Sequence, residues 1–335
     1  MKIDMIRYGS FIGLLLIAGT LLLISSAAAH PELIGMGVLS LTFGLRHAFD
    51  IDHIAAIDNM TRKLLNDGKN VRGVGFSFSF GHSLVVILMT LGTVLFVEWA
   101  KHTMPMITEI GGQLGTLIAA VMLLLLAVIN GFILLNIWRN WQQVRRGHIG
   151  KAEEMVEQSR IYRLFTKLLG LINHNWQVML VGFLFGLGFD TATQIAVLST
   201  SVTAAGEGVA WYGALAFPLL FTAGMCFMDT LDGLFMSSAY NWIFSSPYRK
   251  VYYNLTITCI SILAAGFIGL VDLLQGLSSV FGWQGQLTTW VNGLDFNTLG
   301  FYLVGIFAIT WLAALAIWRI FKLADHELLA AEIEK

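Results

Sequence analysis

The chain has 335 residues, of which 56% are hydrophobic and only 12% are charged, and its formal net charge is −1. Soluble domains carry about 25% charged residues, so a mean hydropathy of +0.73 excludes an ordinary soluble domain and predicts an integral protein of a lipid bilayer. A charge close to zero argues against nucleic acid as a partner. The two cysteines, Cys226 and Cys259, both fall in apolar segments and predict neither a disulfide nor a zinc site built on paired cysteines.

Apolar segments recur along the whole chain and predict an all-α, polytopic membrane protein, because lipid offers no partner to open backbone groups. Eight transmembrane helices are expected, at residues 7–28, 33–60, 73–99, 111–138, 176–203, 208–236, 251–274 and 298–321. The first segment also has the layout of a secretory signal peptide, with Lys2 and Arg7 before an apolar run and three alanines after it. We interpret it as the first span.

Lysine and arginine set the expected orientation, because they concentrate in cytoplasmic loops. With the N-terminus inside, eighteen of the 20 Lys and Arg residues lie on the cytoplasmic side, Lys101 lies outside and Arg46 lies within a span. An even number of spans then predicts that both termini are cytoplasmic and that the protein lies in the cytoplasmic membrane.

One long polar stretch divides the chain into a first transmembrane half, 1–139, a cytoplasmic loop, 140–175, and a second transmembrane half, 176–335. For this loop a solvated linker is favoured over a regulatory amphipathic helix. The sequence FGLRHAFD at 43–50 echoes FGLGFD at 185–190, in a span of opposite direction. The echo indicates a possible inverted repeat, and such repeats place a substrate site at their interface near mid-membrane.

The most unusual stretch is RHAFDIDHI at residues 46–54, with two histidines and two aspartates within seven residues. An Arg or Asp at the centre of a membrane helix costs roughly 3 kcal/mol, whereas a large apolar residue returns only about 0.5 kcal/mol. This stretch must therefore face protein, water or an ion, which makes it a candidate site.

Histidine and carboxylate at helical spacing are what a transition-metal site needs. On an ideal helix, His47, Asp50 and His53 follow one another at steps of about 60°. Asp52 points about 140° away from His47, so one straight helix cannot aim all four side chains at one ion.

Two local structures would resolve this conflict: a bend or unwound turn near Gly44, or an Asp52 that orients a histidine from behind. A further ligand is expected from the third span, where a glycine before His82 permits close helix approach. The predicted metal ligands are His47, Asp50, Asp52, His53 and His82.

Other polar residues inside the spans are assigned to the ion pathway or to a second layer around the ligands. They are Arg46, Asp58, Asn59, Ser79, Asp190, Thr191, Thr193, Gln194, Asp229, Thr230 and Asp232. Arg46 is expected to act as a fixed counter-charge for Asp50 or Asp229. The aspartates of the fifth and sixth spans divide evenly between pathway and structural roles. Hydroxyl groups bonded to backbone are expected at Ser79, Thr191, Thr193 and Thr230.

Four motifs in order resemble those of the nickel/cobalt transporter family, often abbreviated NiCoT. The stretch 46–54 is similar to the family's RHA(V/F)DADHI, with isoleucine where the second alanine is usual, and GHS occurs at 81–83. LGFDTATQ at 187–194 resembles LGFDTATE, and GMCFMDTLD at 224–232 resembles GMxxxDTxD. The resemblance covers nearly the whole chain. It implies high-affinity uptake of Ni²⁺, with Co²⁺ as a second substrate, and transport that depends on His47, Asp50, Asp52 and His53.

One position departs from the family pattern, because Gln194 stands where glutamate is usual. Glutamine keeps the shape and the oxygen but loses the charge and the ability to carry a proton. A change in rate or in metal preference is therefore expected.

The predicted function is uptake of Ni²⁺ as transported substrate, without a permanent cofactor or an obligatory protein partner. No phosphate-binding loop of the GxxxxGK[ST] type occurs, so ATP hydrolysis is not expected. One alternative is an exporter, which is disfavoured because the central loop holds only His148 and His174. The other is a membrane-embedded metalloenzyme, disfavoured because no HExxH motif occurs and the polar groups spread over four spans.

Overall fold

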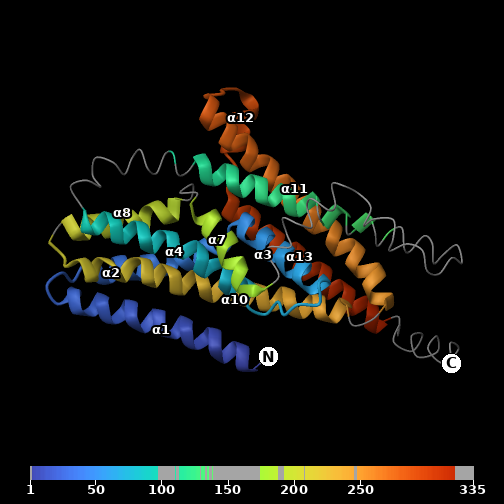
Figure 1. Ribbon diagram of the computed structural model, residues 1–335, viewed down its shortest axis with the longest axis horizontal. Helices are drawn as coiled ribbons and strands as arrows, with labels where there is room; N and C mark the ends of the chain where they lie inside the picture. The colour runs from blue at the N-terminus through green and yellow to red at the C-terminus, as the bar shows by residue number, and fades with distance from the viewer. Residues whose placement is uncertain are drawn as a thin grey trace, which may run out of the picture.

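The computed structural model describes residues 2–96, 113–128, 174–187, 192–206, 208–244 and 247–320, with short pieces at 110, 130–132, 134–135 and 138. Within these residues the protein is helical and contains no strand, so the all-α class is confirmed. Most of the elements are labelled in Figure 1. In chain order they are α1 (Lys2–Ala27), α2 (Leu33–His47), α3 (Ile51–Asn66), α4 (Val74–Leu95), η1 (Asn175–Gln177), α7 (Val178–Gly186), α8 (Ala192–Gly206), α9 (Trp211–Ala214), α10 (Ala216–Phe244), α11 (Pro247–Phe281), α12 (Gln286–Asn292) and α13 (Phe296–Ile320).

Five helices of the described chain are long and apolar enough to cross a membrane. They are Met5–Ala27, Val74–Leu95, Gln113–Phe132, Trp211–Tyr240 and Thr258–Phe281. Shorter apolar helices cover the remaining predicted spans, at Leu33–His47, Asn175–Gly186, Ala196–Ala205 and Thr298–Ala313. A multi-pass membrane protein is therefore supported, while the count of eight spans stays a prediction. Almost all of the central loop, up to residue 173, lies outside the described residues.

The predicted second span is divided into α2 and α3. The chain leaves the helix after His47 and starts a new one at Ile51, with Asp50 in an extended conformation at φ −62° and ψ 135°. We expected the break near Gly44, but α2 continues for three more residues and ends at His47. Gly44 instead stays helical and packs directly on the backbone of Phe221.

The predicted fifth span is divided as well. It begins with the short 3₁₀ turn η1 and continues as α7, which ends at Gly186, and α8 begins at Ala192. Neither the second nor the fifth predicted span is one continuous helix, and both contain the echoed FGL sequence.

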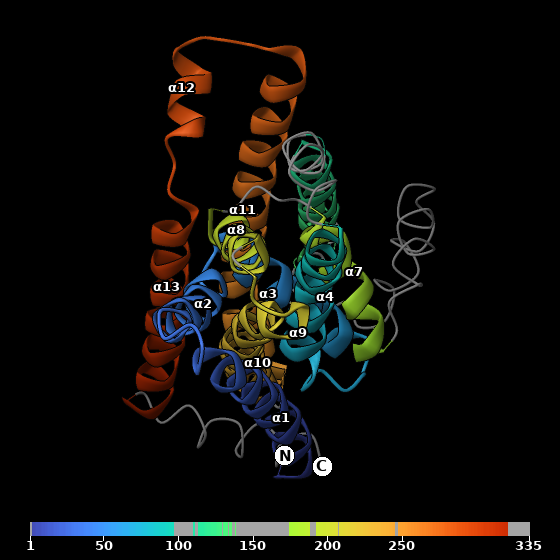
Figure 2. The same cartoon turned by 90° about the vertical axis from the view of Figure 1, so that its left-hand side faces the viewer.

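Helix α10 lies at the centre of the bundle, in contact with α1, α2, α3 and α4. Figure 2 shows α10 between α1 and the pair formed by α3 and α4. Helix α4 also packs along α7, and α3 is covered by α11 and α13. The short α12 and the adjoining end of α11 project beyond the other helices in both views.

Glycines allow α4 to approach its neighbours at backbone distance. A Cβ atom on Gly81 would overlap the carbonyl oxygen of Met179 in α7, and one on Gly75 would overlap the carbonyl oxygen of Asp229 in α10. Small residues at such positions let helices pack closely in a membrane, where the hydrophobic effect does not drive helices together. The close contacts hold α4 against both neighbours.

We predict that Gly81→Ala destabilises the fold, because the added methyl group must push α4 and α7 apart. Overpacking of this kind costs about 1–3 kcal/mol, so the melting temperature in detergent should fall by several degrees. Gly92→Ala is the matched control, since a Cβ on Gly92 of the same helix meets no atom within 4 Å. Equal melting temperatures for the two variants would contradict the prediction.

Candidate metal centre

Three histidines from three helices meet where α2 ends and α3 begins. His47 is the last residue of α2, His53 lies in the first turn of α3, and His82 lies on α4. One coordinating nitrogen of each ring lies within 4.8 Å of those of the other two. Each side chain is at most 2% exposed. The sequence expectation that these three residues act together therefore has a geometric basis.

The break in the helix is what brings His47 and His53 together. Residues six apart on a continuous α-helix are separated by about 9 Å along its axis. The two rings are instead 4.6 Å apart between centroids, because the extended Asp50 changes the direction of the chain between them. The ring of His82 lies 4.6 Å from that of His53 and 5.0 Å from that of His47.

The spacing of the ring nitrogens suits a metal ion. The Nε2 atoms of His47 and His82 are 3.0 Å apart. Histidine nitrogens bind transition metals at about 2.1 Å, so two such ligands at a right angle around one ion are separated by about 3 Å. At this distance the lone pairs of two neutral imidazoles would repel each other if both faced the same point. A proton or a metal cation between the two nitrogens removes this repulsion.

Carboxylates stand behind two of the three rings. Asp50 Oδ2 lies 2.8 Å from His47 Nδ1, and Asp229 Oδ2 lies 3.4 Å from His53 Nδ1. A proton on each Nδ1 then donates to a carboxylate, which leaves the lone pair on Nε2 facing the cluster. Such a carboxylate fixes the ring orientation and makes the ligand nitrogen more basic. The Nε2 atom of His53 is buried and has no hydrogen-bond partner among the described residues.

Gln194 of α8 completes the cluster. Its Nε2 atom lies 2.6 Å from His82 Nε2 and 3.2 Å from His47 Nε2, and its side chain is fully buried. The Oε1 atom has no hydrogen-bond partner in the described part of the chain. A half-turn of the amide would exchange the two atoms and direct the oxygen at the histidines. This position, expected in the pathway or second layer, thus touches the predicted ligands directly.

The two aspartates of the motif, Asp50 and Asp52, each contact one histidine of the cluster. The set of mutually close coordinating atoms, among the described His, Cys, Asp and Glu side chains, contains neither Asp50 nor Asp52. Asp50 contacts His47, as above. The Oδ1 atom of Asp52 accepts a hydrogen bond of 2.9 Å from the backbone N–H of His53. Asp52 therefore holds the first turn of α3, on which His53 lies.

The structure shows the surroundings of several residues that were predicted to line the ion pathway. The hydroxyl of Ser79 donates to the carbonyl of Gly75 at 2.9 Å, and that of Thr230 donates to the carbonyl of Cys226 at 2.5 Å, as predicted for packing residues. Arg46 is exposed near the end of α2. Two candidates, Asp190 and Thr191, lie outside the described residues, as does the side chain of Thr193.

A second buried polar network follows the histidines along α3. Asp58 lies five residues after His53, about 7.5 Å along the helix axis. Arg62 forms an ion pair with Asp58, at 3.8 Å from Nη2 to Oδ1, and both side chains are fully buried. Arg62 also donates to hydroxyl oxygens of α10 and α11, at 2.6 Å to Tyr240, 2.5 Å to Thr258 and 2.8 Å to Ser261.

The same network buries a residue that the predicted orientation places on the cytoplasmic side. Arg62 is completely covered, and its guanidinium bonds to side chains of α10 and α11. Tyr240 donates its hydroxyl proton to Asp58. Asn59 bonds to Asn130 in the fourth predicted span. Together with Arg62, Asp58 and Asn59 thus join α3 to three other helices.

A small cavity lies beside the helix break. It has a volume of about 250 Å³ and lies between the break at Ala48 and Phe49, helix α10 and helix α13. Asp232 is the one ionisable residue in its lining, and one carboxylate oxygen of Asp232 is buried without a hydrogen-bond partner in the described chain. Apart from this carboxylate the lining is apolar.

Comparison with known proteins identifies the family to which the chain belongs. Residues 33–317 match the profile of the family described as high-affinity nickel-transport protein. The chain belongs to this family. The match confirms the resemblance drawn from the four motifs, and members of this family are transporters rather than enzymes.

Curated relatives support this family assignment over most of their length. The chain is 44% identical to the nickel transporter NixA of Staphylococcus aureus over 329 residues, which cover 97% of each protein. It is 44% identical to the nickel transporter NicT of Mycobacterium tuberculosis, over 85% of this chain and 79% of that one. It is 36% identical to the cobalt transport protein NhlF of Rhodococcus rhodochrous, over 86% and 84%. No solved structure gives a significant match.

We predict that Arg62→Met lowers the free energy of unfolding by about 3–5 kcal/mol, because it leaves the buried carboxylate of Asp58 without its counter-charge. The midpoint of thermal unfolding in detergent measures the loss. The double variant Asp58→Asn/Arg62→Met should regain part of it, since the remaining side chain is neutral. A double variant no more stable than the single one would show that the ion pair is not the cause.

Proposed function

We propose that this protein takes up Ni²⁺ across the cytoplasmic membrane and that His47, His53 and His82 bind the ion during passage. The observation that carries the proposal is the convergence of three buried imidazoles from three helices, at a spacing that suits one metal ion. Imidazole is a strong ligand for Ni²⁺ and Co²⁺. Family membership supports nickel as the substrate.

The carboxylates and the amide adapt this cluster to a divalent ion. Asp50 and Asp229 sit behind two of the rings and compensate the charge of the cation without occupying its coordination positions. Gln194, with its amide turned, offers a neutral oxygen as a further ligand. A site with three nitrogens and few negative charges in contact with the ion favours release, which a transporter needs at each turnover.

Co²⁺ is the second candidate substrate. It prefers the same nitrogen and oxygen ligands, and selectivity between the two metals depends on geometry rather than on intrinsic affinity. One relative of this chain is named a cobalt transport protein. We propose nickel as the principal substrate, because most of the relatives are named for nickel.

We further propose eight membrane passages with both termini in the cytoplasm, in two halves, 1–139 and 176–335, joined by the loop 140–175. The divided second and fifth spans support this arrangement, since α2 ends two residues after the FGL sequence at 43–45 and α7 ends within the FGL sequence at 185–187. Discontinuous helices in corresponding positions of two halves are typical of substrate sites in transporters built from inverted repeats.

The membrane potential provides sufficient energy for uptake. It is worth about 4.6 kcal/mol for a divalent cation at 100 mV, at roughly 2.3 kcal/mol per charge. Neither ATP hydrolysis, a permanent cofactor nor a further protein is required by this scheme. The cavity beside the break, in which Asp232 is the one ionisable residue among the described lining residues, is the proposed access route on one side of the cluster. Export through the same route is the alternative, and the direction of flux decides between them.

His47→Ala should abolish accumulation of radioactive nickel in cells, because it removes one of the three nitrogens that contact the ion. His30→Ala is the matched control, since His30 lies at the surface between α1 and α2 and bonds to Glu32. Both variants must reach the membrane in equal amounts. Normal nickel accumulation by His47→Ala would overturn the proposed site, and nickel efflux from loaded vesicles by the wild-type protein would support export instead.

Gln194→Glu should leave the protein folded and change the rate or the ratio of nickel to cobalt uptake. The new carboxylate would stand within about 3 Å of two ligand nitrogens, in place of the amide, and a charged ligand binds a cation more tightly than a neutral one. Uptake of both metals should be measured in the same vesicles. An unchanged rate and an unchanged ratio would show that charge at this position does not affect transport.

A further inference from the structure

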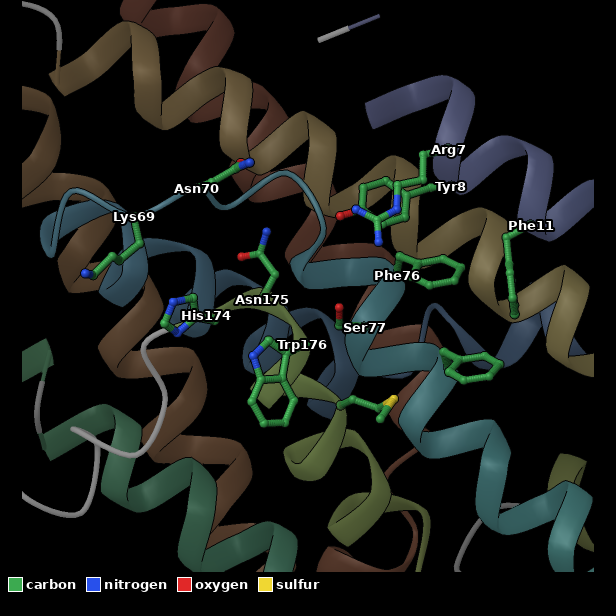
Figure 3. Close-up of a pocket in the computed structure, with 12 residues that line it drawn as sticks. Arg7, Tyr8, Phe11, Lys69, Asn70, Phe76, Ser77, His174, Asn175 and Trp176 are labelled. Atoms are coloured by element: carbon green, nitrogen blue, oxygen red, sulfur yellow. The ribbon is translucent and has the colours of Figure 1, made fainter. Parts of the chain in front are cut away.

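A large cavity lies away from the histidines, near the start of α1. Its volume is about 590 Å³, and its walls come from α1, the connection between α3 and α4, the first turns of α4, and the chain around η1. Figure 3 shows Arg7 on α1 extending toward the space between Asn175 and Phe76, with Lys69 at the opposite rim. Three parts of the chain that are distant in sequence thus surround one open space.

The lining of this cavity carries positive charge. Arg7 and Lys69 provide this charge, His174 lies in the same lining, and among the described residues no carboxylate belongs to it. Arg7 and Lys69 are both exposed, and neither has an ion-pair partner within the described part of the chain. Two cations that face the same cavity without a counter-charge would repel Ni²⁺ and favour an anion.

Neutral groups in the cavity add hydrogen-bond donors. The 22-residue helix α4 begins at Val74, and Phe76 and Ser77 of its first turns line the cavity. The start of a helix favours an anion through its dipole, although the N–H groups of Val74 and Ser77 already donate to the carbonyls of Val71 and Gly73. Asn175 reaches the middle of the lining in Figure 3, and its Oδ1 atom is buried without a hydrogen-bond partner among the described residues. With the amide turned, the same atom position presents an N–H to an anion.

The rest of the wall is aromatic and apolar. Phe11, Phe76 and Phe80 form a continuous set, with Phe11 edge-on to the other two at centroid distances of 5.4 Å and 5.2 Å. Trp176 is 60% exposed at the rim. Tryptophan is enriched where the headgroups meet the hydrocarbon of a membrane. An occupant with a negatively charged head and a hydrocarbon tail matches both parts of the cavity.

We propose that this cavity binds the headgroup of an anionic phospholipid from the cytoplasmic leaflet, with the phosphate near Arg7 and Lys69 and an acyl chain along the phenylalanines. The proposal rests on the orientation given under Proposed function, which places these residues at the inner surface. Basic pockets between membrane helices on this side are suited to acidic headgroups. A bound lipid would connect α1 to α4 and α7.

Native mass spectrometry of the full-length protein tests the proposal. The protein is equilibrated in mixed micelles with equal amounts of phosphatidylglycerol and phosphatidylcholine, and the retained lipids are counted. The wild type should retain phosphatidylglycerol preferentially. Arg7→Gln/Lys69→Gln should lose this preference, by roughly fivefold for each cation removed. The matched control is Arg249→Gln/Lys250→Gln, which removes two charges at the start of α11 and should keep the preference.

Equal losses in the two double variants would overturn the proposal in favour of diffuse surface charge. Displacement of the lipid by millimolar inorganic phosphate would also overturn it, because the site would then be one for a free anion. The single variant Lys69→Glu, on an exposed connection, gives the same readout if the double variant fails to fold, and it should also lose the preference. His47→Ala should retain the lipid while losing nickel uptake. An absence of nickel uptake by the wild type would contradict the proposed function and leave the lipid count unaffected.

Discussion

The structure depends on the interruption of one membrane helix between His47 and Ile51. A continuous helix would hold His47 and His53 about 9 Å apart along its axis, too far to share an ion, whereas the observed rings are 4.6 Å apart. The interruption leaves backbone N–H and C=O groups without their helical partners, and lipid cannot form hydrogen bonds with them. The turn bonds from Phe49 to Arg46 and from Asp50 to His47, together with α10 and α13 on either side, provide the needed partners and cover.

The buried charged residues near α3 have two different roles: some contact the histidines, and others connect α3 to neighbouring helices. Around the histidines, Asp50 and Asp229 contact ring nitrogens of His47 and His53, so these two carboxylates lie directly behind the candidate metal ligands. Farther along, Asp58 is committed to Arg62 and Tyr240, and the arginine bonds three hydroxyl groups on two other helices. A hydrogen-bonded network of this kind stiffens its surroundings. These contacts tie α3 to α10 and α11 on the side away from the helix break.

Much of the site was predictable because the cost of burying charge in a membrane makes each polar residue conspicuous. The motif at 46–54, His82 and Asp229 were all identified in this way, and the structure brings His47, His53 and His82 together. The position of the break was predicted less well, since glycine at 44 signalled a bend but serves close packing against α10. Gln194 was noticed for its departure from the family pattern, but its contact with two histidines was not predicted.

The sequence by itself determined the class of protein, the membrane as its solvent and the chemistry of the candidate ligands, because these follow from composition and from local spacing. Only the tertiary structure decided which polar side chains meet. Gln194 reaches histidines 112 and 147 residues away, and Arg62 is buried by tyrosine, threonine and serine residues 178 to 199 residues away. Contacts across such separations arise from the packing of whole helices, which no local pattern in the chain specifies.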